Sequence, residues 1–116
     1  MEDCLFCKIA NKEIATEIIF EDDKVMIFND INPQAPVHLL VIPKKHIASL
    51  DAIETEDSLL IGHIFQVIKE QMRLRGFNNI KEGYRVVTNL GENGGQTVGH
   101  VHFHVLAGRN LQWPPG

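Results

Sequence analysis

Three histidines alternate with bulky apolar residues near the end of the chain, in the segment HVHFHVL at 100–106. A period of two predicts a β-strand, because successive side chains of a strand point to opposite faces of its sheet. Val101, Phe103 and Val105 would pack inward, and the three histidines would share the other face. Protonated imidazoles repel one another, so structure alone does not favour such a row. The row therefore indicates a site of metal ligands, acid–base catalysts or a nucleophile.

The sequence offers few other groups for nucleophilic chemistry. No Asp or Glu adjoins the histidines, and no serine lies in a nucleophile elbow. A neutral histidine nitrogen is a good nucleophile toward phosphorus. If the sheet is a meander, His38, Asn89 and Thr97 converge on the row. Histidine and asparagine donors would stabilise charge on phosphoryl oxygens, and Thr97 or a neighbouring histidine would protonate a leaving amine. This set favours phosphoryl or nucleotidyl transfer that needs no Mg²⁺ cradle.

The elements that must position these residues follow from apolar spacing. The length of 116 residues predicts one domain, 1–116. Helical spacing predicts a short helix over 5–13 and a long helix over 57–75. Apolar and β-branched runs predict strands at 17–21, 25–29, 37–43 and 84–89, before the histidine row. We therefore expect an α+β fold with a five-stranded, mainly antiparallel sheet, one long helix and one short helix.

Two loops and the end of the chain are further candidates. The loop 30–36 contains two prolines and leaves Asp30 at a strand end. The glycine-rich segment 91–97 is either a flexible hairpin connection or a place where the backbone approaches a phosphate. Trp113 is expected to dock on its own domain or on a partner subunit rather than to stay in water.

Charge and hydropathy exclude several classes of function. The net charge of −4 argues against a non-specific grip on a nucleic-acid backbone, so we expect no stable nucleic-acid binding. The longest apolar runs are too short to span a bilayer, so no membrane binding is expected. The first residues, Met1 to Cys4, lack the basic and apolar regions of a signal peptide. We expect a cytoplasmic protein.

The two cysteines form one Cys4-x-x-Cys7 pair. A structural disulfide is disfavoured in a reducing cytoplasm. A redox pair and one half of a zinc site both remain open from the spacing.

The segment 100–106 resembles the signature of the histidine-triad (HIT) superfamily, His-φ-His-φ-His-φ-φ. The resemblance covers essentially the whole chain, since IFEDD at 19–23, INPQAP at 31–36, VIPKKHI at 41–47 and GGQT at 94–97 fall in the expected order. The terminal WPPG is similar to the Hint branch, the purine nucleoside phosphoramidases. The resemblance implies a HIT-like fold and a hydrolase without a catalytic cofactor. It would cleave the P–N bond of purine nucleoside 5′-phosphoramidates, such as AMP derivatives, through a nucleotidyl-histidine intermediate and release the nucleoside monophosphate.

The resemblance also implies catalytic roles for individual residues. His102 would be the nucleophile, with His38 behind it as a proton relay. His104 and Asn89 would contact the phosphate. Thr97 stands where the family usually has serine and would keep a hydroxyl near the leaving nitrogen, so the leaving-group preference could differ.

The implied nucleotide pocket takes residues from several elements. Asp30 would bind the ribose hydroxyls, and Gly95 and Gln96 of the glycine-rich segment belong to the same site. The apolar base pocket would consist of Phe6, Ile9, Phe28 and Ile31, with Asn29 on its edge. Family members are homodimers that join two sheets into one, with the long helix also at the interface. Trp113 would then reach toward the site of the neighbouring subunit.

The cysteine pair resembles a bacterial, zinc-bearing subset of the superfamily. In that subset a tetrahedral Cys₂His₂ site would be completed by Cys4, Cys7, His46 and His100. The zinc would be structural and would pin the N-terminal helix to the sheet.

Two other functions fit the same residues. A zinc-dependent hydrolase would use the histidine row as ligands, and chelation would abolish its activity. A non-catalytic nucleotide-binding or scaffold protein would bind nucleotide without turnover, whether or not His102 is replaced. A redox protein based on the cysteine pair is more distant, because no thioredoxin-like βαβ pattern surrounds the pair.

Overall fold

The protein is described by a computed structural model covering residues 3–116. Met1 and Glu2, which belong to the expected domain and to the segment expected to lack a signal peptide, lie outside the described residues. The strands are β1 (Ile18–Glu21), β2 (Val25–Asn29), β3 (Val37–Pro43), β4 (Arg85–Val87) and β5 (Phe103–Ala107). The α-helices are α1 (Leu5–Ala10), α2 (Ser58–Leu74) and α3 (Gly91–Gly94). No helix within residues 3–116 is long and apolar enough to cross a membrane.

All five strands form one antiparallel sheet in the order β1-β2-β3-β5-β4. The expected α+β fold with a five-stranded antiparallel sheet is confirmed. The simple meander is wrong, because β5 inserts between β3 and β4. The reason lies in burial: β5 alternates buried and half-buried side chains, whereas the three residues of β4 are only half-buried and suit the edge. This order places His104 beside β3, opposite Leu40.

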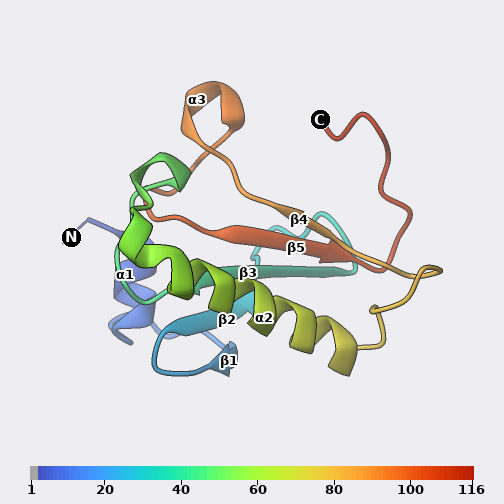
Figure 1. The fold of residues 1–116 in the computed structure, drawn as a ribbon, viewed down its shortest axis with the longest axis horizontal. Helices are drawn as coiled ribbons and strands as arrows, with labels where there is room; N and C mark the ends of the chain where they lie inside the picture. The colour runs from blue at the N-terminus through green and yellow to red at the C-terminus, as the bar shows by residue number, and fades with distance from the viewer. Residues whose placement is uncertain (1–2) are drawn as a thin grey trace.

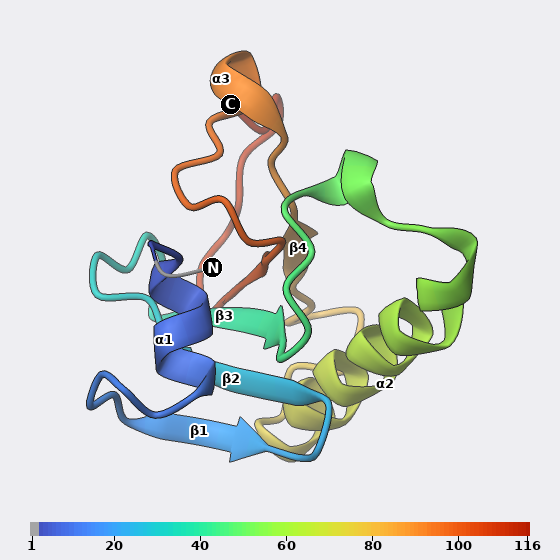
Figure 2. The same ribbon diagram turned by 90° about the vertical axis from the view of Figure 1, so that its left-hand side faces the viewer.

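The sheet has a core on each face, and the helices divide between them. Strands β2 and β3 are buried almost throughout, because alternate residues pack in opposite directions. One core lies against α2 and contains Val25, Ile27, Leu39 and Val41. The other lies against α1 and contains Met26, Phe28, Leu40 and Ile42. Figures 1 and 2 show α2 and α1 on either side of the sheet. The histidine row faces α1.

Helix α2 uses the predicted apolar stripe to cover its face of the sheet. Ile64, Val67, Ile68 and Met72 are buried at helical spacing against the strands. The helix begins one residue later than predicted, after a 3₁₀ turn over Thr55–Asp57.

The histidine strand begins later than predicted. β5 starts at Phe103, and residues 100–102 are not paired with β3. The backbone N–H of Val101 donates instead to the carbonyl of Ile47, at 2.6 Å. Val101, Phe103 and Val105 are nevertheless buried in the α2 core, so the predicted alternation of faces is confirmed.

Three other boundaries differ from the predictions. The short helix ends at Ala10, because the chain turns at Asn11 and Lys12 takes a left-handed φ of 62°. The strand predicted over 84–89 is reduced to Arg85–Val87. The glycine-rich segment contains one helical turn, α3, so the described chain has three helices rather than the two expected.

Candidate functional site

A cavity of about 260 Å³ lies between α1 and the sheet face that carries the histidines. Its lining is mostly apolar, with polar groups at one side, which is the usual composition of a small-molecule site. It brings together many of the residues expected to bind nucleotide: Phe6, Ile9, Phe28, Asn29, Asp30, Ile31, Thr97, His102 and His104.

His102 lines this cavity and presents one ring nitrogen to it. Its Nδ1–H donates to the backbone carbonyl of His100, at 2.7 Å. A carbonyl can only accept, so in the neutral ring the proton sits on Nδ1 and the lone pair sits on Nε2. The ring is buried, and the edge of Phe6 packs on it with ring centroids 5.0 Å apart. Nε2 is thus the nitrogen that the neutral ring would leave available for attack.

His38 lies behind His104, whereas the resemblance implied a place behind His102. The two rings are joined from Nε2 of His38 to Nδ1 of His104, at 2.9 Å. The sheet register explains this placement, since Leu40 pairs with His104 and His38 lies two residues away on the same face. The position behind His102 is occupied by the His100 carbonyl.

The direction of this hydrogen bond follows from a backbone group. The N–H of Gln34 donates to Nδ1 of His38, at 3.0 Å. Nδ1 therefore carries the lone pair, and Nε2–H of His38 donates to His104. Burial lowers the pKa of both histidines, and the charges of His102 and His38 lower that of His104 further. Both rings are accordingly neutral at pH 7, and His104 carries its proton on Nε2.

Asp30 is the third side chain at the pair formed by His38 and His104. Its Oδ2 lies 3.5 Å from Nε2 of His38 and 3.9 Å from Nδ1 of His104, while its Oδ1 accepts the N–H of Asn32. These three side chains are close enough to hold a metal ion. Because His38 already accepts at Nδ1 and carries its proton on Nε2, the two histidines instead form a hydrogen-bonded pair with the Asp30 carboxylate beside it.

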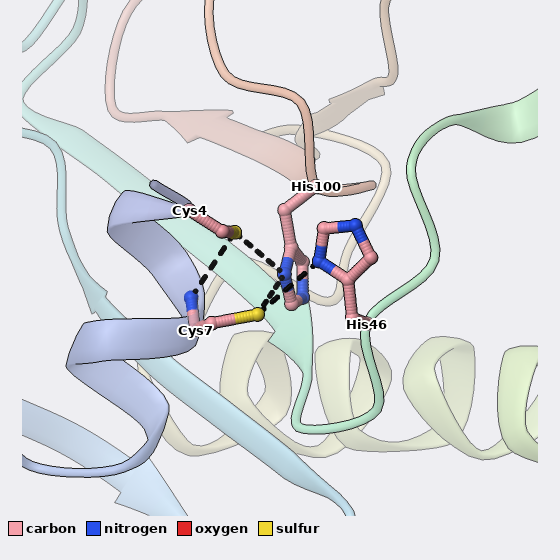
Figure 3. Close-up of side chains that lie close together, drawn as sticks. All are labelled: Cys4, Cys7, His46 and His100. Atoms are coloured by element: carbon pink, nitrogen blue, oxygen red, sulfur yellow. Dashed lines mark hydrogen bonds between the residues drawn. The ribbon is translucent and has the colours of Figure 1, made fainter. Parts of the chain in front are cut away.

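A second cluster lies at the other end of the histidine row, where Cys4, Cys7, His46 and His100 meet (Figure 3). The cysteines come from α1 and its N-cap, His46 follows β3, and His100 precedes β5. Sulfur-to-Nδ1 distances are 3.3 Å for Cys4–His100, 3.2 Å for Cys7–His46 and 3.5 Å for Cys7–His100. Tetrahedral zinc with ordinary bond lengths separates sulfur and nitrogen ligands by about 3.6 Å, so the four side chains fit a zinc ion.

Hydrogen bonding prepares His100 for this role. Its Nε2–H donates to the carbonyl of Pro43 at 2.8 Å, which leaves the Nδ1 lone pair directed at the sulfurs. Burial lowers the pKa of His100, so the ring is neutral. Burial, followed by the neighbouring Cys4 side chain, raises the pKa of the Cys7 thiol to about 11. A divalent cation is the group that would hold such a thiol as thiolate.

Four residues expected at the nucleotide site do not line the cavity of this chain. Asn89 is half-buried outside it, and Gly95 ends α3 with a φ of 81°. Gln96 closes its own loop, because its side chain donates to the carbonyls of Ala48 and Val98. Trp113 is 81% exposed and lies over Arg85 instead.

The cavity also contains residues that sequence reasoning missed: Leu5, Thr16, Leu40 and Val98. Strand periodicity could have identified Leu40, because it shares a strand face with His38. Helical periodicity could have identified Leu5, because it precedes Ile9 by one turn. Thr16 and Val98 lie outside the helices and strands, and no pattern marks them.

A larger hollow of about 690 Å³ lies between the start of α2 and the β1–β2 turn. Several of its charged side chains already have partners, as Lys45 pairs with Asp57 and His63 with Asp22. The smaller cavity beside the histidines, where free ring nitrogens converge, is therefore the candidate site.

The chain is similar to known proteins over nearly its whole length. Residues 3–112 match the family model described as scavenger mRNA decapping enzyme C-term binding. An uncharacterized HIT-like protein of Synechococcus elongatus is 49% identical over 115 residues, which are 99% of this chain and 98% of that protein. The crystal structure of a HIT family hydrolase from Legionella pneumophila has a TM-score of 0.94 and 47% identity, covering 98% of this chain and 100% of its own. A histidine triad nucleotide-binding protein from Candida albicans has a TM-score of 0.77 and 35% identity, covering 97% of this chain and 83% of its own.

Proposed function

Because this chain belongs to the histidine-triad (HIT) family, we propose that it cleaves the P–N bond of purine nucleoside 5′-phosphoramidates, as an adenosine 5′-monophosphoramidase does. The single observation that supports this most is the placement of His102. It lines the mostly apolar cavity, and its Nδ1–H donates to a backbone carbonyl, so Nε2 is the nitrogen left for attack. The Candida albicans relative is named a nucleotide-binding protein, and that name favours the same substrate class.

The proposed reaction has two steps at phosphorus. Nε2 of His102 attacks the α-phosphorus, the new P–N(imidazole) bond forms, and the bond to the amine breaks. Nε2–H of His104 contacts the phosphoryl oxygens, and the leaving amine takes up a proton from solvent, relayed by the Thr97 hydroxyl. Water then cleaves the nucleotidyl-histidine and restores His102, giving the nucleoside monophosphate. Asp30 would hold the ribose hydroxyls, and Phe6 and Phe28 the base.

Hydrolysis of adenosine 5′-phosphoramidate by wild type and by His102→Asn tests the proposal. Wild type should turn over, and the variant should lose several orders of magnitude in kcat, because asparagine cannot form the covalent intermediate. His63→Asn, in α2 with its ring paired to Asp22 and away from the cavity, is the matched control and should retain activity.

Full activity in His102→Asn would exclude this residue as the nucleophile. A parallel reaction with excess EDTA separates the remaining functions. Turnover should survive chelation while the fold persists. Loss of activity with an intact fold would favour a zinc-dependent hydrolase, and AMP binding without turnover would favour a non-catalytic nucleotide-binding protein.

We also propose that the cluster of Cys4, Cys7, His46 and His100 holds a structural zinc ion, supported by the donor set and its spacing. Protein purified without chelator should contain one zinc per chain by atomic emission. Cys7→Ser should lower that ratio and the stability of the fold, since part of the metal-binding free energy is folding free energy. Both cysteines are free thiols, which suits the reducing cytoplasm that we propose as the location.

A homodimer is the proposed assembly. Strand β4 is an edge of the sheet, and Phe65 of α2 is 47% exposed. Trp113, which is exposed in the single chain, would then contact the site of the partner subunit. Light scattering should give twice the mass of one chain, 13.1 kDa.

A further inference from the structure

We infer that the Cys–His cluster and the nucleotide cavity are coupled through α1, so that a divalent metal in the cluster and a purine nucleotide in the cavity each raise the affinity for the other. The cluster consists of Cys4, Cys7, His46 and His100. This inference rests on the proposed nucleotide site and the proposed metal centre. It adds a mutual effect on binding affinity that neither site requires by itself.

The first reason is that one short helix serves both sites. Cys4 and Cys7 enter the cluster, while Phe6 and Ile9, from the same two turns, line the cavity. Helix α1 has only six residues, and a helix of that length is not stable without tertiary contacts. The anchoring of its cysteines therefore also fixes one wall of the cavity.

Phe6 is the residue that joins the two sites most directly. It lies between the cysteines in the sequence and is 4% exposed. Its ring centroid lies 5.0 Å from that of His102, 6.1 Å from His100 and 5.5 Å from Phe28. Phe6 thus contacts a ligand of the cluster, the proposed nucleophile and the opposite wall of the cavity together.

His100 provides a second connection, through the backbone. Its ring is held between the cysteine sulfurs at Nδ1 and the Pro43 carbonyl at Nε2. Its own carbonyl accepts the Nδ1–H of His102, at 2.7 Å. A displacement of the His100 ring would therefore move the acceptor that sets the orientation of His102.

The energetic consequence is a reciprocal effect on binding. A metal that orders α1 removes part of the conformational entropy that a nucleotide would otherwise lose against a mobile wall. Thermodynamic linkage then requires the nucleotide to raise metal affinity by the same factor. We expect about tenfold, within the usual range for coupled sites. Phe6 and the cluster residues act here as positioning residues.

Calorimetric titration of full-length protein with AMP tests this directly. AMP should bind the zinc-loaded protein about tenfold more tightly than protein treated with a chelator. Competition for zinc against a coloured chelator, with and without saturating AMP, should give the same factor. Equal AMP affinity in both forms would overturn the coupling while leaving the proposed function intact. No AMP binding by either form would contradict the proposed nucleotide site itself.

Two variants distinguish coupling from a general effect on binding. Phe6→Ala retains all four cluster residues, and it should reduce the ratio of the two AMP affinities to near one. Ile31→Ala removes a cavity residue that lies outside α1, in the loop after β2. It should weaken AMP binding to both forms equally and leave the ratio near ten. A ratio that Phe6→Ala leaves unchanged would exclude α1 as the connection.

Cobalt substitution keeps the test valid if the chelated protein unfolds. Co²⁺ bound by two sulfurs and two nitrogens has visible ligand-field bands that report the geometry of the site. AMP should shift these bands in wild type, and the shift should be absent in Phe6→Ala at saturating AMP. A spectrum that AMP does not change in wild type would overturn the inference.

Discussion

At the scale of single residues, the chemistry of the histidine row depends on which nitrogen each ring leaves free. His100 gives its Nε2–H to Pro43 and turns Nδ1 toward the sulfurs. His102 gives its Nδ1–H to the carbonyl of His100 and lines the cavity, so Nε2 is the nitrogen left for attack there. Two identical side chains, two positions apart, are thus suited to metal ligation and to nucleophilic attack respectively. Backbone carbonyls make this distinction, because they can only accept.

The backbone of Gln34 gives a prediction at this scale. Gln34→Pro removes the N–H that donates to Nδ1 of His38, so His38 is no longer fixed as a donor to His104. We expect kcat for the phosphoramidate to fall about tenfold, equivalent to the loss of roughly 1.4 kcal/mol of transition-state stabilisation. Nitrogen-15 shifts of the His38 ring should report a mixture of tautomers.

Gln34→Ala is the matched control, since it keeps the backbone donor and removes only the side chain. It should retain kcat within a factor of about two and a single His38 tautomer, because the hydrogen bond that fixes the ring is unchanged. If the proline and alanine variants had the same kcat, the Gln34 N–H would have no part in positioning the histidine pair.

At the scale of elements, two short connections hold the site in place. Helix α1 covers one side of the cavity, and the loop 30–36 between β2 and β3 supplies Asp30 and the Gln34 donor. This loop is held from the C-terminal side, because Arg109 donates to the carbonyl of Gln34 at 3.0 Å. The turn after β5 brings Gly108 against Pro36, so the end of the chain supports the histidine pair from outside the cavity.

Gly108→Ala is expected to disturb that support. Gly108 has a φ of 96°, which an L-residue rarely adopts, and an added Cβ would lie 2.9 Å from Cβ of Pro36. We expect the free energy of unfolding to fall by about 1–3 kcal/mol, measured by urea denaturation.

Gly62→Ala provides the comparison. Gly62 lies within α2 with nothing within 4 Å of an added Cβ, so alanine should raise the free energy of unfolding by up to about 1 kcal/mol. Equal effects of the two substitutions would show that the contact with Pro36 does not constrain the chain.

At the scale of the whole molecule, burial of neutral histidines links stability to pH. The pKa values of His38 and His104 are lowered in the folded protein, chiefly by burial. Below about pH 6.5 the unfolded chain takes up protons at these histidines before the folded chain does. The free energy of unfolding is therefore expected to fall as the pH decreases from 7 to 5, by up to about 1.4 kcal/mol per pH unit for each histidine.

Urea denaturation between pH 5 and 7, with EDTA present in every sample, measures this slope without a contribution from metal release. His104→Asn should show a shallower dependence, because one of the imidazoles whose pKa is lowered in the folded protein is gone. A free energy of unfolding that did not change over this range would contradict the expected burial of neutral rings.

Much of the fold could be predicted because it depends on local patterns. The bounds of β2 and β3 match the predicted runs at 25–29 and 37–43, since strands buried on both faces read as continuous apolar segments. The buried stripe of α2 follows from helical spacing alone. The start of β5 could not be predicted well, because the backbone N–H of Val101 finds its partner in the distant Ile47. The end of α1 depends on the left-handed turn at Lys12, which apolar spacing does not record.

The sequence by itself determined which residues alternate, which faces are apolar and which side chains could do chemistry, because side-chain periodicity is a local property. Tertiary structure alone decided that β5 lies between β3 and β4 and that His38 meets His104 across 66 positions of the chain. It also decided which nitrogen of each ring is free. One of the bonds that set those choices joins residues far apart in the sequence, His100 and Pro43. The bonds to His102 and His38 are local, but they depend on backbone conformation, which side-chain periodicity does not record.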